Sequence, residues 1–360
     1  MTALRTPPQA NPSAQRPRPR RPRTDRPAKW AAYADDALLV LRFRDLDLRI
    51  EGTWLVDRIA QLHQEIAQRG IRFRPHCWLS SDWFSPDGVP GIAIPFYLAH
   101  RRLMKLEDRK MLVVEGGTKT WCMKLLRHEA GHAIQTAFRL NRRAEWRRQF
   151  GPSTKPYPKH YLPEPFSKNH VQHLDWWYAQ SHPCEDFAET FAVWLKPGAQ
   201  WRRRYKGWPA LAKIEYVDAL MADIAGKIAP IKSCERMDPL HELDTRLAQY
   251  YEKKQDRYGS SFPEVYDRDL RRLFEAPGKG GAPAAALLRR VGPEIRRRVA
   301  VWTGEHVYTI NQLLSDMITR CRELDIRANR PVAEVRLDAA ILLTMQFTNF
   351  LQSGAHRLAI

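Results

Sequence analysis

Cysteine is scarce in this chain of 360 residues, and its distribution excludes two common structural uses. The five cysteines are odd in number and widely spaced, at positions 77, 122, 184, 234 and 321. Such a set gives no framework of paired disulfides, and without a CxxC pair it builds no zinc ribbon. The sequence therefore predicts a protein of a reducing compartment.

Long apolar runs are also missing. Residues 1–29 contain a single large aliphatic residue, Leu4, so they lack the apolar core of a signal peptide. No stretch of the chain approaches the roughly 18 apolar residues that a membrane-spanning helix requires, so we expect no span. By elimination, the sequence predicts a cytoplasmic protein.

Negative charge is in short supply, with 40 Asp and Glu against 59 Lys and Arg and a formal net charge of +19. Residues 1–30 are rich in proline and arginine and contribute +7 of this excess, from eight Lys and Arg against one Asp. They bury too little apolar area to offset the entropy of ordering, so we expect a disordered basic tail. The basic surface and tail predict an acidic partner, nucleic acid included, but such a surface also serves solubility alone.

What the chain does contain is the motif His128-Glu129-Ala130-Gly131-His132, an HExxH sequence. Apolar residues on both sides indicate a helix that begins after Thr118 as its N-cap. Residues four apart lie on one helical face, so His128 and His132 direct two imidazoles at a single ion. Zinc accepts such nitrogens and keeps one position for water, and Glu129 is placed to take a proton from that water. The alternative is a solvated helix that carries two histidines by accident.

The residues after the motif restrict the class of zinc site. A metzincin would carry Gly at 135 and His at 138, where this chain has Gln135 and Phe138. The third ligand is therefore expected to be a glutamate on a later helix, as in gluzincins. Glu185 and Glu189 lie four apart on a second predicted helix, and Glu185 follows His132 by 53 residues.

The stretch from Tyr178 to Leu195, YAQSHPCEDFAETFAVWL, resembles the putative zinc-binding metallopeptidase family of bacteria and is also similar to the catalytic domain of anthrax lethal factor. The resemblance spans roughly residues 45–225. It implies that Glu185 is the third zinc ligand and that Glu189 holds His128 from behind. It also implies that Tyr178, seven residues before Glu185, donates to the transition state. Plain aromatic packing is the alternative for Tyr178. The cysteine-rich zinc ribbon frequent in that family is missing here.

The order of the predicted elements favours an α+β fold. It consists of a zincin-like catalytic domain, with a small mixed sheet and the HExxH helix, followed by a mostly helical C-terminal region. The predicted parts are a disordered tail (1–30), a metallopeptidase domain (31–230) and a helical region (231–360). Within the second part we expect a helix that begins at Thr53 and ends just before Gly70, strands at 71–79, 91–98 and 111–114, the active-site helix from 118 to about 139, and a long loop at 141–175. Five residues of that loop are predicted to contact an acidic substrate or only to wrap the surface: Lys155, Lys159, His160, His170 and His173.

These observations predict a zinc-dependent metallopeptidase that binds one Zn²⁺ per chain and acts on a peptide or protein substrate. The metal lowers the pKa of bound water, Glu129 is the general base and Tyr178 assists the developing oxyanion. Two alternatives stay open. One is a basic protein that binds nucleic acid or protein and has a structural or degenerate zinc site, which the presence of Glu129 disfavours. The other is a zinc hydrolase of non-peptide amides.

Overall fold

The structure is a computed structural model, and it describes residues 28–158, 160–161, 163–164, 166–175, 177–258, 267–274, 281–352 and 358–359. Most of the predicted basic tail, residues 1–27, lies outside these ranges. Trp30, the last residue of that predicted tail, is buried, and its indole nitrogen donates to the carbonyl of Leu46 at 3.0 Å.

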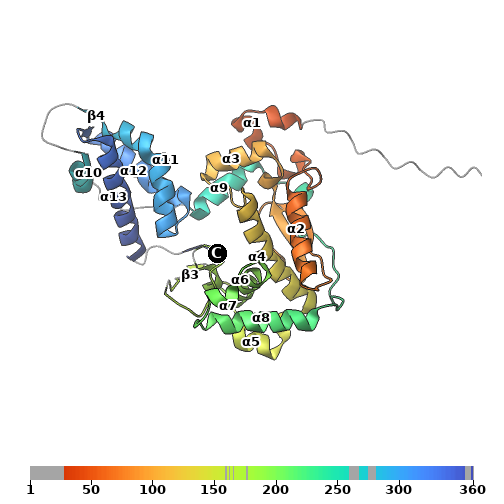
Figure 1. Ribbon diagram of the computed structural model, residues 1–360. Helices are drawn as coiled ribbons and strands as arrows, with labels where there is room; N and C mark the ends of the chain where they lie inside the picture. The colour runs from red at the N-terminus through yellow and green to blue at the C-terminus, as the bar shows by residue number, and fades with distance from the viewer. Residues whose placement is uncertain are drawn as a thin grey trace, which may run out of the picture.

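The chain folds mainly into helices, with short strands between them (Figure 1). The elements up to residue 258 are α1 (Asp35–Leu39), α2 (Leu55–Gln68), β1 (His76–Ser80), β2 (Gly91–Pro95), α3 (Arg101–Met111), α4 (Lys119–Phe138), α5 (Ala144–Phe150), β3 (His160–Tyr161), α6 (Pro183–Leu195), α7 (Trp201–Arg204), α8 (Ala210–Ile224) and α9 (Leu247–Tyr258). Those that follow are α10 (Asp267–Phe274), β4 (Ala282–Pro283), α11 (Ala284–Thr303), α12 (Val307–Glu323), β5 (Arg327–Ala328), α13 (Val332–Gln352) and β6 (Leu358–Ala359). Short 3₁₀ turns join them, at Lys29–Ala32, Phe43–Leu46, Phe96–Ala99, Leu140–Arg142, Tyr178–Gln180 and Leu240–Glu242.

The strands pair only two at a time within the described residues. Strands β1 and β2 are parallel, with His76 opposite Gly91 and Ser80 opposite Pro95. An isolated antiparallel bridge joins Phe84 to β2. β3 pairs with β6 and β4 with β5, both antiparallel. A mostly helical chain with this small sheet fits the predicted α+β class, while the zincin-like detail stays a prediction.

Two separate clusters of buried apolar side chains form the interior. The first runs from Trp30 to Tyr251 and joins α2, β2, α4, α6, α8 and α9. The second runs from Leu270 to Phe347 and lies within the bundle of α10 to α13, which Figure 1 shows set apart from α2, α4 and α6. Among the described residues no helix is both long and apolar enough to cross a membrane.

Several predicted elements differ from the observed ones. The strand predicted at 71–79 is limited to His76–Ser80, after Pro75, which cannot donate a ladder hydrogen bond. The strand predicted at 91–98 ends at Pro95 and turns into 3₁₀ backbone. The strand predicted at 111–114 is wrong, because α3 continues to Met111 and ends on Leu112 with φ 63°. An apolar run this short does not distinguish a strand from the end of a buried helix.

The predicted loop at 141–175 contains helix α5, which the sequence reading did not foresee. Trp146 and Phe150 are the buried residues of this helix and pack against Phe187 of α6. With only two turns, α5 is too short for a clear helical period. The C-terminal region, which was predicted to be mostly helical, contains the long helices α11, α12 and α13.

Candidate metal centre

Helix α4 carries the HExxH motif, and its ends follow from local sequence. The Thr118 hydroxyl accepts a hydrogen bond from the amide of Trp121 at 3.2 Å, as an N-cap does. The helix ends on Arg139, which has left-handed backbone with φ 53°. Its orientation is fixed beside the motif by Arg127, whose guanidinium makes two 2.7 Å hydrogen bonds to the buried carboxylate of Glu65 on α2.

Helix α6 brings the second half of the site against α4. It begins with His182 as N-cap and Pro183 at its first position, and the backbone amide of Cys184 donates to His182 Nδ1 at 3.1 Å. The two helices approach closely at Gly131, where a Cβ atom would lie only 2.8 Å from the Cα of Ala188. The glycine of the motif is therefore needed for contact between the helices.

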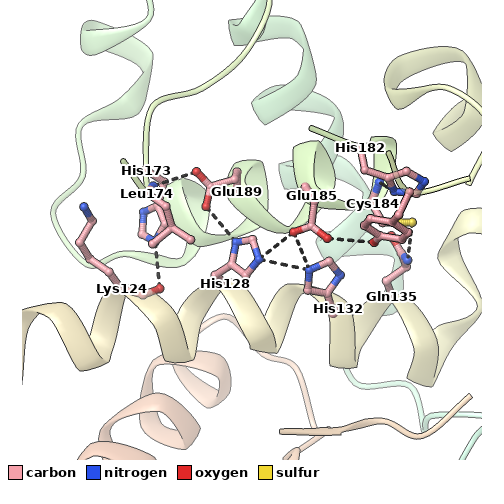
Figure 2. Close-up of polar contacts among 11 residues, drawn as sticks. Lys124, His128, His132, Gln135, His173, Leu174, His182, Cys184, Glu185 and Glu189 are labelled. Atoms are coloured by element: carbon pink, nitrogen blue, oxygen red, sulfur yellow. Dashed lines mark hydrogen bonds and ion pairs between the residues drawn. The ribbon is translucent and has the colours of Figure 1, made fainter. Parts of the chain in front are cut away.

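Three side chains from these helices converge on one point (Figure 2). His128 Nε2 lies 3.0 Å and His132 Nε2 3.2 Å from Oε2 of Glu185, and the two imidazole nitrogens are 3.2 Å apart. An ion at about 2.0–2.1 Å from each atom in tetrahedral geometry would require separations of about 3.3 Å. The donor set and its spacing therefore fit zinc, and this is the one group of His, Cys, Asp or Glu in the described chain that could hold a metal ion.

The imidazoles and the Glu185 carboxylate shift one another's pKa values. Burial disfavours a charged ring, yet the hydrogen bonds with Glu185 and Glu189 outweigh it and raise the pKa of His128 well above its ordinary value. Burial likewise opposes ionisation of Glu185, but His132 and His128 hold the pKa of that carboxyl well below its ordinary value. Glu185 is therefore a buried carboxylate that faces two imidazoles.

Glu189 lies behind His128 and does not join the convergent group. It is fully buried, and its Oε1 accepts a 2.8 Å hydrogen bond from His128 Nδ1, while its Oε2 accepts one from the amide of Leu174 at 2.8 Å. Because Nδ1 bonds to Glu189, the ring presents Nε2 to Glu185. This is the arrangement by which a carboxylate orients a metal-binding histidine.

Glu129 and Tyr178 also lie at this site. Glu129 is buried, and burial raises the pKa of its carboxyl although His128 and His132 oppose the shift. The ring of Tyr178 is 5.6 Å from that of His128, centre to centre. Burial, with Glu185 nearby, raises the pKa of Tyr178 well above its ordinary value, so its hydroxyl keeps its proton and remains a donor.

Comparison with known proteins supports this reading for the segment that contains the site. Residues 120–200 match a protein family described as "Putative zinc-binding metallo-peptidase". The predicted resemblance to this family is thereby confirmed. No curated protein and no solved structure matches the chain, and the similarity to the catalytic domain of anthrax lethal factor stays a prediction.

The family segment contains a residue that sequence reasoning missed. The hydroxyl of Tyr157 donates to Oε1 of Glu185 at 2.8 Å, the oxygen that does not face the imidazoles. Its ring stacks on His182 at 3.7 Å between centres. His182 in turn donates from Nε2 to the carbonyl of Lys155 at 2.7 Å, because its Nδ1 already accepts from Cys184. The His-Pro pair could have identified the N-cap, but no signal identified Tyr157.

The residues predicted to contact an acidic substrate behave differently from one another. His173 is buried and its Nε2 donates to the carbonyl of Lys124 at 2.9 Å, which favours the alternative of a structural wrap at this position. His170 is partly buried, 3.9 Å from Asp186. The side chain of Lys155 is exposed. Lys159 and the side chain of His160 lie outside the described residues.

Proposed function

We propose that this chain is a zinc-dependent metallopeptidase in which His128, His132 and Glu185 hold one Zn²⁺. The observation that carries the proposal is the convergence of these three ligand atoms beside Glu129, on helices α4 and α6. Three protein ligands with a fourth position left for water distinguish catalytic zinc sites from structural ones, which have four. The family match supports a peptide as the substrate.

Bound zinc supplies a Lewis acid that lowers the pKa of water and polarises a carbonyl group. The protein's own residues supply the remainder. Glu129 accepts the proton of the attacking water and returns it to the leaving nitrogen. Glu189 keeps the His128 ring in the orientation that presents Nε2. Tyr178 donates a hydrogen bond to the carbonyl oxygen as negative charge develops there.

Replacing Glu129 by Gln tests the proposal. Gln has nearly the same shape but no basic oxygen, so Glu129→Gln should fold and retain zinc while turnover falls at least about 10²-fold. Cleaved ends in a proteome digest, compared between wild type and variant, would identify substrates and measure the loss.

Elemental analysis and thermal melting check that the variant is intact. Glu145→Gln, an exposed carboxylate on α5, is a matched control and should cleave at the wild-type rate. A Glu129→Gln protein that cleaves an identified substrate as fast as wild type would show that the proposed mechanism is wrong.

A further inference from the structure

A cleft of about 490 Å³ lies between α4 and the junction of α11 with α12. Its walls come from α3, the start of α4, the segment before Tyr178, α9, and the residues around 300–307. Helix α9 packs against both α3 and α12 and so connects the two sides (Figure 1). A cleft of this size can hold one or two side chains of a bound peptide.

Three tryptophans from three parts of the chain line this cleft: Trp121, Trp177 and Trp302. Trp302, at the end of α11, is 84% exposed, and its neighbour Val301 is 77% exposed. Large apolar side chains clustered on the solvent-exposed surface usually mark a binding site for a ligand or another protein. Indole rings are also the strongest aromatic partners for a cation.

The cleft is acidic on a molecule that is strongly basic. Four carboxylates line it, Glu107, Glu115, Asp175 and Glu305, against the cations Lys254 and Arg297. His306 also lines the cleft, but it is neutral, because burial and the nearby Lys254 lower its pKa to about 3. A chain of net charge +19 thus presents an excess of negative charge at this one cleft.

Two of these carboxylates have too little positive charge nearby to offset their burial. Glu107 is 1% exposed and pairs through Oε1 with Lys254 at 2.8 Å, and burial raises the pKa of its carboxyl although Lys254 and Tyr251 oppose the shift. Burial and the nearby Asp82 raise the pKa of Glu115 to about 7. A cation in the cleft would stabilise the ionised form of both carboxylates.

The cleft adjoins the candidate metal centre. Trp121 precedes His128 by seven residues on α4, so both lie on the same helical face, about 10.5 Å apart along the axis. Trp177 directly precedes Tyr178. An extended peptide rises about 3.3 Å per residue, so this distance corresponds to about three residues of bound substrate.

We propose that this cleft binds a lysine or arginine side chain of the peptide substrate, about three residues from the cleaved bond. The inference rests on the proposed function and adds a substrate class to it. The tryptophan faces would hold the cationic group and the carboxylates would balance its charge. An acidic side chain would meet like charges here, and an aliphatic one would add no positive charge to balance the carboxylates.

Two measurements test the proposal. Digestion of a proteome-derived peptide library should show Lys and Arg enriched about three positions from the cleaved bonds. Binding is measured separately, on Glu129→Gln protein, by fluorescence anisotropy with two labelled heptapeptide pools. One pool has a fixed central arginine and the other a fixed citrulline, which has nearly the same shape without charge. The arginine pool should bind at least tenfold more tightly.

Exposed residues allow variants that do not disturb the core. Trp302→Ala should reduce the preference for arginine about twofold to fivefold, the range for an exposed cation–π contact. Asp175→Asn should reduce it in the same direction. Leu337→Ala, which is 63% exposed in the same bundle and lies outside the cleft, should leave it unchanged.

The two possible failures are distinguishable. Equal binding of the two pools, or a preference that Trp302→Ala does not alter, overturns the cleft assignment whether or not peptides are cleaved. Binding that favours arginine, without any cleavage by the wild type, supports the cleft and contradicts the peptidase.

Discussion

Glu185 contacts both imidazoles of the candidate centre, whereas Glu189, one turn later on α6, contacts one imidazole alone, at Nδ1 of His128. The two side chains share a helix and are both buried, so neither residue type nor burial separates them. The residues that each carboxylate contacts distinguish Glu185 from Glu189. The difference predicts unequal effects on metal binding when each carboxylate is removed.

Glu185→Ala should abolish tight zinc binding because it removes a proposed ligand atom. Glu189→Ala should weaken binding only about 10–100-fold, the usual effect of losing a residue that orients a ligand. Competition with a chelator of known affinity measures both constants. If the Glu189 variant loses zinc and the Glu185 variant retains it, the two roles have been exchanged.

Two tyrosines contact the site in ways that predict different defects. Tyr157 bonds to Glu185, so Tyr157→Phe should weaken zinc binding, by about tenfold, while the ring still stacks on His182. Tyr178 is proposed to act only as charge develops, so Tyr178→Phe should lower kcat about 10²–10³-fold and leave zinc affinity unchanged. Metal titration and single-turnover kinetics separate these effects. A Tyr178 variant with normal kcat would favour plain packing.

The site residues differ in how far the sequence could predict them. Helical geometry alone places His128 and His132 on one face, because four residues make slightly more than one turn. Selecting Glu185 over Glu189 required a family resemblance, since both lie on the same face of α6. Tyr157 was not predictable, because its position depends on a loop that His182 fastens to the start of α6.

At the scale of elements, the site depends on how closely α4 and α6 approach. The signals for α4 were strong, with an N-cap, a sustained apolar pattern and a definite end. Its contact with α6 was not predictable, because it depends on a small residue in each helix, Gly131 and Ala188. Short elements such as α5 and the misassigned strand at 111–114 have too few residues for their period to decide between helix and strand.

Gly131→Ala should therefore affect both stability and the site. The added methyl group would lie 2.8 Å from backbone of α6, which cannot rotate away, so the helices must separate. Overpacking of this kind costs about 1–3 kcal/mol. Each kcal/mol lowers Tm by about 2–4 °C in a domain of this size. Separation also moves Glu185 from the histidines, so zinc affinity should fall.

Thermal melting and zinc titration provide the measurements, with Thr120→Ala as the control at an exposed position of the same helix. A Gly131→Ala protein that melts and binds zinc like wild type would mean that the helices can separate without cost. It would also mean that the close contact does not position Glu185.

On the scale of the whole molecule, the described chain has two hydrophobic clusters, and the candidate metal centre lies on the helices of only one of them. The predicted division at residues 30 and 230 stays a prediction, and the buried residues of the first cluster extend to Tyr251 on α9. The predicted attraction of an acidic partner or nucleic acid to the basic surface also stays a prediction. Composition indicates a charge sign but not where on the surface that charge gathers, so the acidic cleft could not be foreseen.

The two clusters predict that heat unfolds the protein in two transitions. A ligand stabilises only the unit that binds it, by about 2.7 kcal/mol when its free concentration is 100 times Kd. Removal of zinc by a chelator should therefore lower one transition, that of the cluster containing α4 and α6, and leave the transition of the α10–α13 bundle in place. Differential scanning calorimetry with and without chelator measures both. His132→Ala protein should already show the lower value and respond little to chelator. A single transition that moves as a whole would instead mean that the contacts of α9 with α12 couple the clusters into one cooperative unit.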